Sequence, residues 1–179
     1  SGVTRGVHIT LQKSIPMQAG LGGGSSDAAA ALIGLNTFWQ LGLRSDQLHL
    51  LAAQLGSDVN FFLDSVPLAV CRGRGERILP IPLTRPLHFV LCKPSGGLST
   101  RDVFQQLQMA PPHGSGQIQQ ALRGGQVHHI GTQLHNSLEV PARQLSAEVT
   151  HTLSAMGRVS QVGYLMTGSG SSCFALCSH

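Results

Sequence analysis

Aromatic side chains, charged side chains and long apolar runs are all scarce in this sequence. Its 179 residues include one Trp, one Tyr and six Phe, and only 11% are charged. So few aromatics argue against a surface that stacks nucleic-acid bases, and no run of Lys or Arg marks a nucleic-acid groove. No apolar stretch is as long as a membrane span and no secretory signal opens the chain, so we expect no membrane partner. The net charge of +4 suits a small anionic ligand.

The cysteines and histidines are dispersed. No Cys-x-x-Cys pair occurs, and most of the cysteines fall in apolar, strand-like runs, so we expect buried thiols in a reducing compartment, either a bacterial cytoplasm or a plastid-type one. Three histidines can share a helix face, but no acidic residue accompanies them at zinc-like spacing, so we expect surface histidines. The residues concerned are Cys71, Cys92, Cys173, Cys177, His128, His129 and His135.

Hydrophobic periodicity predicts helices and strands in irregular order, which indicates an α+β protein. Three prolines between Leu79 and Pro86 mark a domain boundary, giving lobes 1–82 and 83–179. The chain begins without Met and ends in a strand-like run, so we expect an internal piece of a longer protein. Strands are predicted over 7–13, 67–71, 87–93, 162–166 and 173–177, helices over 25–41, 45–55 (with Ser45 as N-cap), 101–109, 126–138 and 141–156, and a mobile connector over 110–116.

A glycine-rich run, Gly20 to Asp27, stands directly ahead of an apolar helix. The start of a helix has unpaired N–H groups and the positive end of the helix dipole. Glycines ahead of it let the backbone curl so that several N–H groups point at one anion. Ser25 and Ser26 add hydroxyl groups, which can donate to phosphate or bind a metal ion on it. This run predicts a phosphate cradle.

The alternative is a tight strand-to-helix connection that binds nothing. The run is not a Walker A loop, because no Lys follows Gly24, and it is not a Rossmann fingerprint, because no acidic residue at a strand end follows about twenty residues on. Four glycines in five positions, followed by two serines, favour phosphate over the empty connection. Asp27 lies in the first helical turn, where it would repel phosphate, so we assign it to nucleotide binding through the loop amides, a base or a sugar.

Asp58 is the candidate general base. It follows Gly56-Ser57 and precedes an apolar run, and a carboxylate near phosphates can take or orient a hydroxyl proton. An N-cap aspartate would fit the same position slightly better. Asp64 and Asp102 are weaker candidates for a base.

The segment Thr167 to Ser172 is a second glycine loop, and it joins two predicted strands. A hairpin turn and a phosphate loop explain it equally well when it is taken alone. Two such loops in one chain favour a shared phosphate-bearing cleft.

Together these segments resemble the GHMP kinase superfamily, over nearly the whole chain. Pro16 to Ala29 is similar to its middle signature, and Leu55 to Val59 to the segment that carries its catalytic aspartate. Gly73 to Glu76 is similar to its Gly-x-Gly-Glu strand end. Three further segments resemble its substrate-side loop, its Asn-Asp-Leu-Glu and its third loop: Pro94–Phe104, Asn136–Glu139 and Thr167–Ser171.

The resemblance implies an ATP-dependent kinase with a partial ribosomal-S5-domain-2-like N-terminal lobe and a truncated ferredoxin-like C-terminal lobe. The triple glycine before Ser-Ser-Asp-Ala-Ala resembles the kinases of the non-mevalonate isoprenoid pathway, whose small-molecule substrate is cytidine diphosphate methylerythritol. The implied catalytic residue is Asp58, and Mg²⁺ is the implied metal, with Ser26 as its candidate ligand. The implied ATP-binding residues are Pro16, Met17, Ala19, Gly20, Leu21, Gly22, Gly23, Gly24, Ser25, Ser26, Asp27, Gly168, Ser169 and Gly170, and the substrate-binding residues are Ser99, Thr100 and Asp58.

The sequence departs from the family in two places. Asn60 stands where the family commonly has Pro. The family's N-terminal Lys-Ile-Asn-Leu and Arg-x-Asp-Gly-Tyr-His segments are absent, and Lys13 is not given the role of their lysine. We therefore expect this fragment alone to be inactive.

Other readings stay open. They are another GHMP kinase, of homoserine or mevalonate type, a nucleotide-binding module without catalysis, and a glycine-rich domain that binds no nucleotide. A homodimer is compatible with each of these readings.

Overall fold

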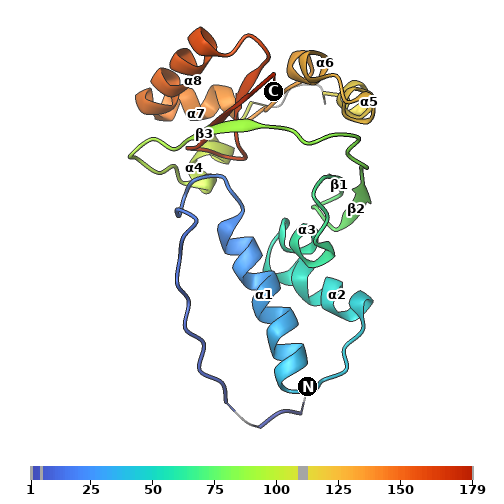
Figure 1. Ribbon diagram of the computed structural model, residues 1–179. Helices are drawn as coiled ribbons and strands as arrows, with labels where there is room; N and C mark the ends of the chain where they lie inside the picture. The colour runs from blue at the N-terminus through green and yellow to red at the C-terminus, as the bar shows by residue number, and fades with distance from the viewer. Residues whose placement is uncertain (1, 5, 109–112, 179) are drawn as a thin grey trace. The chain divides into compact units, whose positions relative to one another are not determined.

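The chain divides into two compact units. The computed structural model describes residues 2–4, 6–108 and 113–178. The first unit combines residues 1–16 with 22–80, and the second combines residues 17–21 with 81–179. The glycine-rich run is therefore the place where the chain passes from the second unit to the first. Figure 1 traces this path.

The first unit packs three helices and a hairpin. The helices are α1 (Gly23–Phe38), α2 (Ser45–Leu55) and α3 (Val59–Asp64), and the strands are β1 (Ala69–Arg72) and β2 (Arg77–Pro80). One residue from each helix forms the buried centre, namely Ala29, Ala52 and Val59. The strands pair antiparallel, from Ala69 opposite Pro80 to Arg72 opposite Arg77. The small residues Ala29 and Ala52 let α1 and α2 pack closely against the first turn of α3, where Val59 and Asn60 are buried.

The helix ends follow the sequence signals only in part. Gly56 caps the end of α2, as predicted. Arg44, not Ser45, is the N-cap of α2, and its N–H donates to Gln47 Oε1 at 3.0 Å. The helix α1 starts at Gly23, two residues before its predicted start, because Gly22 takes the left-handed backbone at φ 66° and the next two glycines join the first turn.

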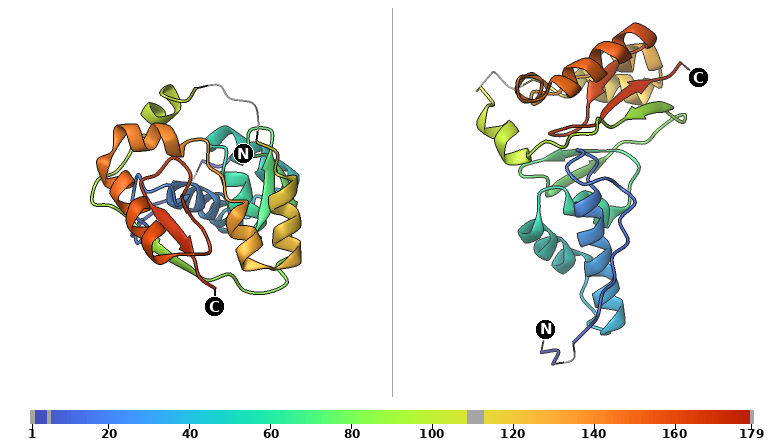
Figure 2. Two further views of the ribbon diagram at one scale, coloured as in Figure 1. Left: turned by 90° about the horizontal axis from the view of Figure 1, so that it is seen from above. Right: turned by 90° about the vertical axis from the view of Figure 1, so that its left-hand side faces the viewer.

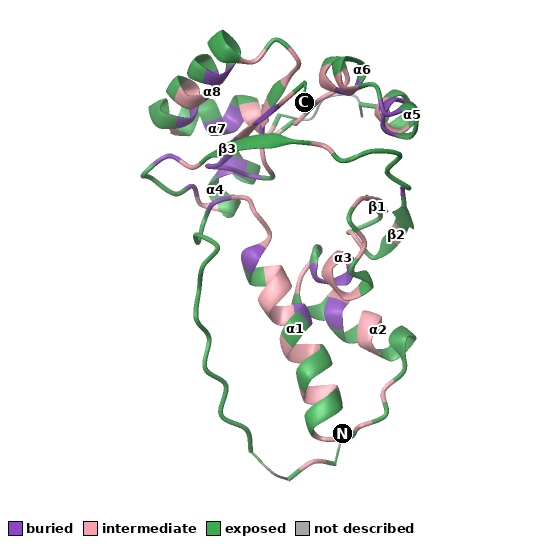
Figure 3. Ribbon diagram, in the orientation of Figure 1, coloured by how far each residue is buried: buried purple, intermediate pink, exposed green. Residues whose placement is uncertain are grey.

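The predicted strand over 7–13 is wrong. Residues 6–18 are exposed, as Figure 3 shows for this stretch, and residues 7–13 have no regular structure. Val7, Ile9 and Leu11 are the apolar half of the alternation, and they are 42%, 57% and 59% exposed. A strand needs a hydrogen-bonded neighbour, and none of the described segments lies in that place.

The second unit is a three-stranded antiparallel sheet with helices against one face. The strands run in the order β3 (Phe89–Cys92), β5 (Cys173–Leu176) and β4 (Tyr164–Met166). Met166, Cys173 and Ala175 pack against buried residues of three helices, and Figures 1 and 2 show α7 and α8 along the sheet. The helices of this unit are α4 (Thr100–Gln105), α5 (Gly116–Gly124), α6 (Val127–Thr132), α7 (Glu139–Leu145) and α8 (Ala147–Val159).

The helices of the second unit differ from prediction at four points. The predicted helix 101–109 is observed as Thr100–Gln105, and residue 109 lies outside the described residues. The predicted helix 126–138 stops at Thr132, and the predicted helix 141–156 divides at Ser146, whose hydroxyl accepts from Val149 N and so starts α8. The helix α5 was missed, because glycines at both of its ends gave it the appearance of a loop. Of the predicted connector 110–116, residues 110–112 lie outside the described residues.

The cysteines are less buried than predicted. Only Cys173 is buried, while Cys71 and Cys92 are exposed and Cys177 is intermediate; all four are free. Burial raises the pKa of the Cys173 thiol to about 12. Cys71 and Cys92 lie on short strands with an open side, so an apolar sequence run did not translate into burial.

None of the helices described is long and apolar enough to cross a membrane.

Candidate functional site

The first turn of α1 has free backbone donors. The first hydrogen bond of the helix runs from Ser26 N to Gly22 O, at 2.9 Å. The amides of Gly23, Gly24 and Ser25 precede it, and they donate to no acceptor among the residues that the structure describes. The prediction that Asp27 lies in this first turn is wrong, because the helix begins at Gly23 and its first turn has no acidic side chain. These amides and the helix dipole together make a site that favours an anion.

The glycines of this turn have different surroundings. A Cβ at Gly22 would lie 2.7 Å from Cζ of Phe62, and one at Gly23 would lie 2.8 Å from Cγ2 of Ile15. A Cβ at Gly24 would meet nothing within 4 Å. Gly22 and Gly23 are therefore required by packing within the unit, whereas the space beside Gly24 is open to a ligand.

Asp27 makes no hydrogen bond to the free amides in the described structure. Its carboxylate pairs with the ammonium of Lys13, and both side chains are about one-third exposed, at 32% and 28%. A Cβ at Gly23 would lie 3.4 Å from Lys13 Nζ, so this cation stands beside the start of α1. The lysine neutralises the carboxylate that would otherwise repel an anion. Sequence reasoning missed the pair because nothing in the pattern joins residues 14 positions apart.

The Asp58 side chain is exposed and makes no capping hydrogen bond. Within the described part of the chain this exposed carboxylate has neither a hydrogen bond nor an ion pair. It does lie close enough to Cys71 that its charge, added to the larger effect of burial, raises the pKa of that thiol. Asp58 therefore occupies the N-cap position of α3, as the alternative interpretation expected, but its side chain does not cap the helix.

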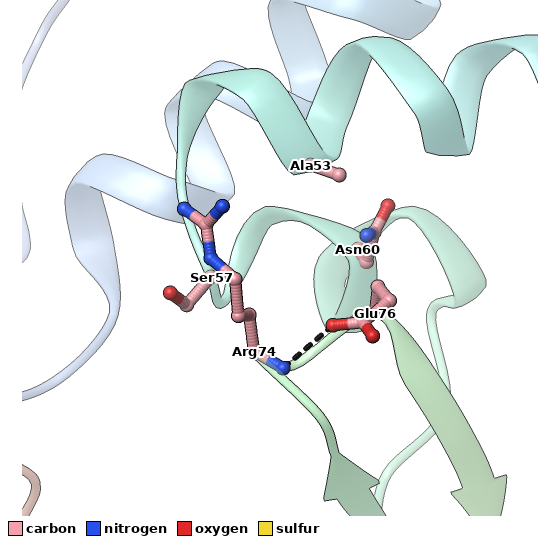
Figure 4. Close-up of a pocket in the computed structure, with 5 residues that line it drawn as sticks. All are labelled: Ala53, Ser57, Asn60, Arg74 and Glu76. Carbon is pink, nitrogen blue, oxygen red and sulfur yellow. Dashed lines mark hydrogen bonds between the residues drawn. The ribbon is translucent and has the colours of Figure 1, made fainter.

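The β1–β2 turn supports the segment that carries Asp58. Gly75 has φ 108°, and a Cβ there would lie 2.0 Å from Ser57 O, so only glycine lets the turn approach this carbonyl. Glu76 closes the turn by accepting from Arg74 N at 2.6 Å, and backbone N–H groups hold the pKa of its carboxyl below the usual range. Figure 4 shows the cavity of about 150 Å³ that this turn forms with Ala53, Ser57 and Asn60.

The second glycine loop is hydrogen-bonded to the backbone at the start of the glycine-rich run. Thr167 Oγ1 donates to Gly20 O at 2.8 Å, and Ser172 N donates to Ala19 O at 3.1 Å. Ser171 N donates to Gln18 O at 3.3 Å. A Cβ at Gly20 would lie 2.2 Å from Thr167 O, so the two backbones meet where no side chain fits. Both segments were predicted to be phosphate loops from their glycines, and the structure brings residues 18–20 and 167–172 together.

Asn136 holds this second loop from the other side. Its Nδ2 donates to Met166 O and to Gly168 O, both at 2.8 Å, while its Oδ1 accepts from Leu138 N at 2.9 Å. Glu139 accepts from Met166 N at 3.3 Å. The Asn136–Glu139 segment, which was noted only for its resemblance to a family motif, thus fixes the backbone at the end of β4.

The predicted substrate residues also meet the second loop. Thr100 Oγ1 lies 2.8 Å from Ser169 Oγ, whereas Ser99 caps α4 by accepting from Asp102 N at 3.3 Å. The hydroxyl of Ser99 is therefore engaged in the helix start. Glu148 anchors the preceding loop through Gly96 N and Ser95 Oγ, and these hydrogen bonds hold the pKa of its carboxyl below the usual range.

The predicted site residues fall into two sets. Residues 22–27 and Asp58 belong to the first unit with Pro16, and residues 17–21, 99–100 and 168–170 belong to the second. Three or more His, Cys, Asp or Glu side chains do not gather into a metal-binding group anywhere in the described residues. His128, His129 and His135 are exposed, so the prediction that they lie at the surface is confirmed.

The sequence and the fold are both similar to those of one known family. Residues 1–67 match the family model of the GHMP kinases N terminal domain. The structure also superposes on a crystal structure of 4-(cytidine 5'-diphospho)-2C-methyl-D-erythritol kinase with a TM-score of 0.74 at 36% identity, over 93% of this chain and 60% of that one. A homoserine kinase from Cytophaga hutchinsonii shares the fold alone, at 17% identity and a TM-score of 0.71. The fold of the chain is the GHMP kinase fold.

Within that family the chain is similar to one kind of kinase. It is 44% identical over 176 residues to the 4-diphosphocytidyl-2-C-methyl-D-erythritol kinase of Shouchella clausii and 42% identical over 178 residues to that of Nocardia farcinica. The matches cover 97% and 96% of this chain, but only 59% and 58% of those relatives. The chain therefore spans about three fifths of the length of the curated relatives it matches.

The Asn136 clamp gives a test of the second loop. Replacing Asn136→Asp keeps the acceptor for Leu138 N, removes both donors, and turns a carboxylate towards the carbonyls of Met166 and Gly168. We expect a loss of about 2 kcal/mol in the free energy of unfolding, from two hydrogen bonds of about 1 kcal/mol each, measured by urea denaturation. Gln144→Glu makes the same chemical change at an exposed position of α7 and is the control. Equal losses in the two variants would contradict the clamp.

Proposed function

We propose that the protein of which this chain is part transfers the γ-phosphate of ATP to the 2-hydroxyl of 4-diphosphocytidyl-2-C-methyl-D-erythritol. The observation that carries the proposal is the first turn of α1, where three consecutive amides lack acceptors in the described structure. Its support from sequence is the 44% and 42% identity to relatives with this name. The family supplies ATP as the phosphate donor.

The amides of Gly23, Gly24 and Ser25 would hold the phosphates. An oxyanion in this position accepts hydrogen bonds that are already oriented and lies at the positive end of the helix dipole. These donors do not have to reorganise when charge develops on the transferring group, which is the property that lowers the barrier. The ammonium of Lys13 pairs with Asp27 beside the same turn, so this carboxylate would not repel the phosphates.

Asp58 would orient the attacking hydroxyl and take its proton. The hydroxyl oxygen bonds to the γ-phosphorus while the bond from that phosphorus to the β–γ bridging oxygen breaks, and ADP leaves. A carboxylate with no hydrogen bond or ion pair to a described residue is available for this task. The roles of Ser99, Thr100, Gly168, Ser169 and Gly170 stay predictions.

Mg²⁺ fits this site only as a partner of the nucleotide. Mg²⁺ usually keeps several waters and is bound by one or two protein groups together with substrate phosphates. Ser26 Oγ donates to Gly23 O at 2.8 Å and keeps its lone pairs for such a bond. The ion would neutralise charge on the phosphates.

We also infer an intracellular enzyme that uses a small-molecule substrate. Whether it forms a dimer is decided by measuring its mass in solution.

The phosphate cradle predicts opposite effects on stability and binding at one residue. Gly24→Ala places a methyl group in open space, and because Cβ atoms lean towards the start of a helix it points at the proposed anion. We expect a gain of up to about 1 kcal/mol in stability from helix propensity, measured by thermal unfolding. We also expect ATP affinity to fall roughly tenfold or more, at least ~1.4 kcal/mol, measured by calorimetry.

Gly34→Ala is the matched control. Gly34 lies in the same helix, and a Cβ there also meets nothing within 4 Å. This variant should gain stability without any loss of ATP affinity. If Gly24→Ala keeps full affinity, the cradle is elsewhere.

The proposed reaction is tested by Asp58→Asn in the intact protein. The amide keeps the shape of the side chain and cannot take a proton, so kcat should fall by roughly 10²- to 10⁴-fold, with ATP affinity almost unchanged. The wild type is assayed on the cytidylyl substrate, homoserine and mevalonate in parallel. Turnover of homoserine or mevalonate alone would replace the proposed substrate. ATP binding without turnover of any of the three would favour a non-catalytic nucleotide-binding module.

A further inference from the structure

His49 of α2 connects both ends of the short helix α3. Its Nδ1 lies 2.9 Å from Asn60 Oδ1, in the first turn of α3, and its Nε2 lies 2.8 Å from Asp64 Oδ1, at the last residue. One imidazole ring therefore ties the whole length of α3 to α2. The N-cap residue of α3, Asp58, makes no side-chain hydrogen bond to the helix.

The Asn60 contact is buried. Asn60 is only 1% exposed and follows the buried Val59. It lines the small cavity together with Ala53 of α2. A buried amide is costly unless it is hydrogen-bonded, so the contact with His49 specifies one orientation of this turn. The side chains of His49 and Asp64 are 26% and 32% exposed, which leaves the outer end of the connection at the surface.

The direction of the Asp58 carboxylate depends on this turn. No capping bond holds the side chain, so its position follows from the backbone of residues 57–60. The burial of Val59 and the approach of Gly75 to Ser57 O fix one side of that backbone. The contact between His49 and Asn60 fixes the other.

We propose that His49, acting through Asn60, is a positioning residue for Asp58. The proposal rests on the proposed function only in that Asp58 is taken as the base. It also accounts for Asn60 at a position where the related family commonly has Pro. Proline in the first turn of a helix restricts the backbone without a partner, whereas asparagine needs one, and His49 supplies it.

The experiment compares His49→Ala with the double variant His49→Ala/Asn60→Pro in the intact enzyme. We expect kcat to fall roughly tenfold in His49→Ala, the size expected when a reacting group is slightly misplaced, while KM for ATP stays the same. The double variant should recover most of the lost kcat, because proline restores the restriction by other means. His151→Ala, which changes an exposed histidine of α8, is the control and should leave kcat unchanged.

The outcomes are distinct. An unchanged kcat in His49→Ala, or a fall in kcat that Asn60→Pro does not recover, would overturn the positioning role. If the wild type turns over no substrate, the proposed function fails, and positioning is then decided by NMR. In that case the backbone amide signals of Asp58 and Val59 and the Asp58 carboxyl carbon should shift in His49→Ala and return towards wild type in the double variant; the absence of any shift would overturn the proposal.

Discussion

Two glycines at the start of α1 occupy places where no side chain fits, and most of the candidate site depends on them. Gly20 brings its backbone against Thr167 O, and Gly22 brings its backbone against the ring of Phe62. Both residues have positive φ, at 70° and 66°. In each unit, therefore, the chain approaches a neighbouring segment that a methyl group would displace. The amides of the turn that follows, Gly23 to Ser25, have no acceptor among the described residues.

The same constraint links the turn to the candidate base. Phe62 lies in α3, which begins one residue after Asp58, and Val59 is buried with Ala29 of α1. The helix that presents Asp58 is thus packed against the helix whose first turn offers the free amides. Gly75 and His49 act on the same few residues from other directions, through Ser57 O and Asn60. This convergence of packing and hydrogen bonds explains how an aspartate without partners of its own is held in a defined place.

Much of this arrangement could be predicted from the sequence, because its signals are local. The run Gly20 to Ser26 indicated a helix start suited to an anion, and Gly56 marked the end of α2. The α+β class and the GHMP kinase fold also followed from the motifs. Asp58 was found because a carboxylate between Gly56-Ser57 and an apolar run is a local pattern.

The features that the sequence did not predict depend on contacts between distant residues. The pairs Lys13–Asp27 and His49–Asn60, and the clamp of Asn136 on Gly168, join elements whose proximity only the fold decides. The strand expected over 7–13 failed for a related reason, since an alternating pattern describes a strand only when another strand lies beside it. Cys71 and Cys92 are exposed for the same reason, since an apolar run is buried only where other elements pack against it.

The most direct measurement is an amide NMR titration of the intact protein with ATP, and with adenosine as the ligand that lacks phosphates. The account predicts that the signals of Gly23, Gly24 and Ser25 move most and saturate with ATP, and that adenosine leaves them in place. If ATP moves other amides while these three stay unchanged, or if adenosine moves them as far, the first turn of α1 does not hold phosphate and the central claim is wrong.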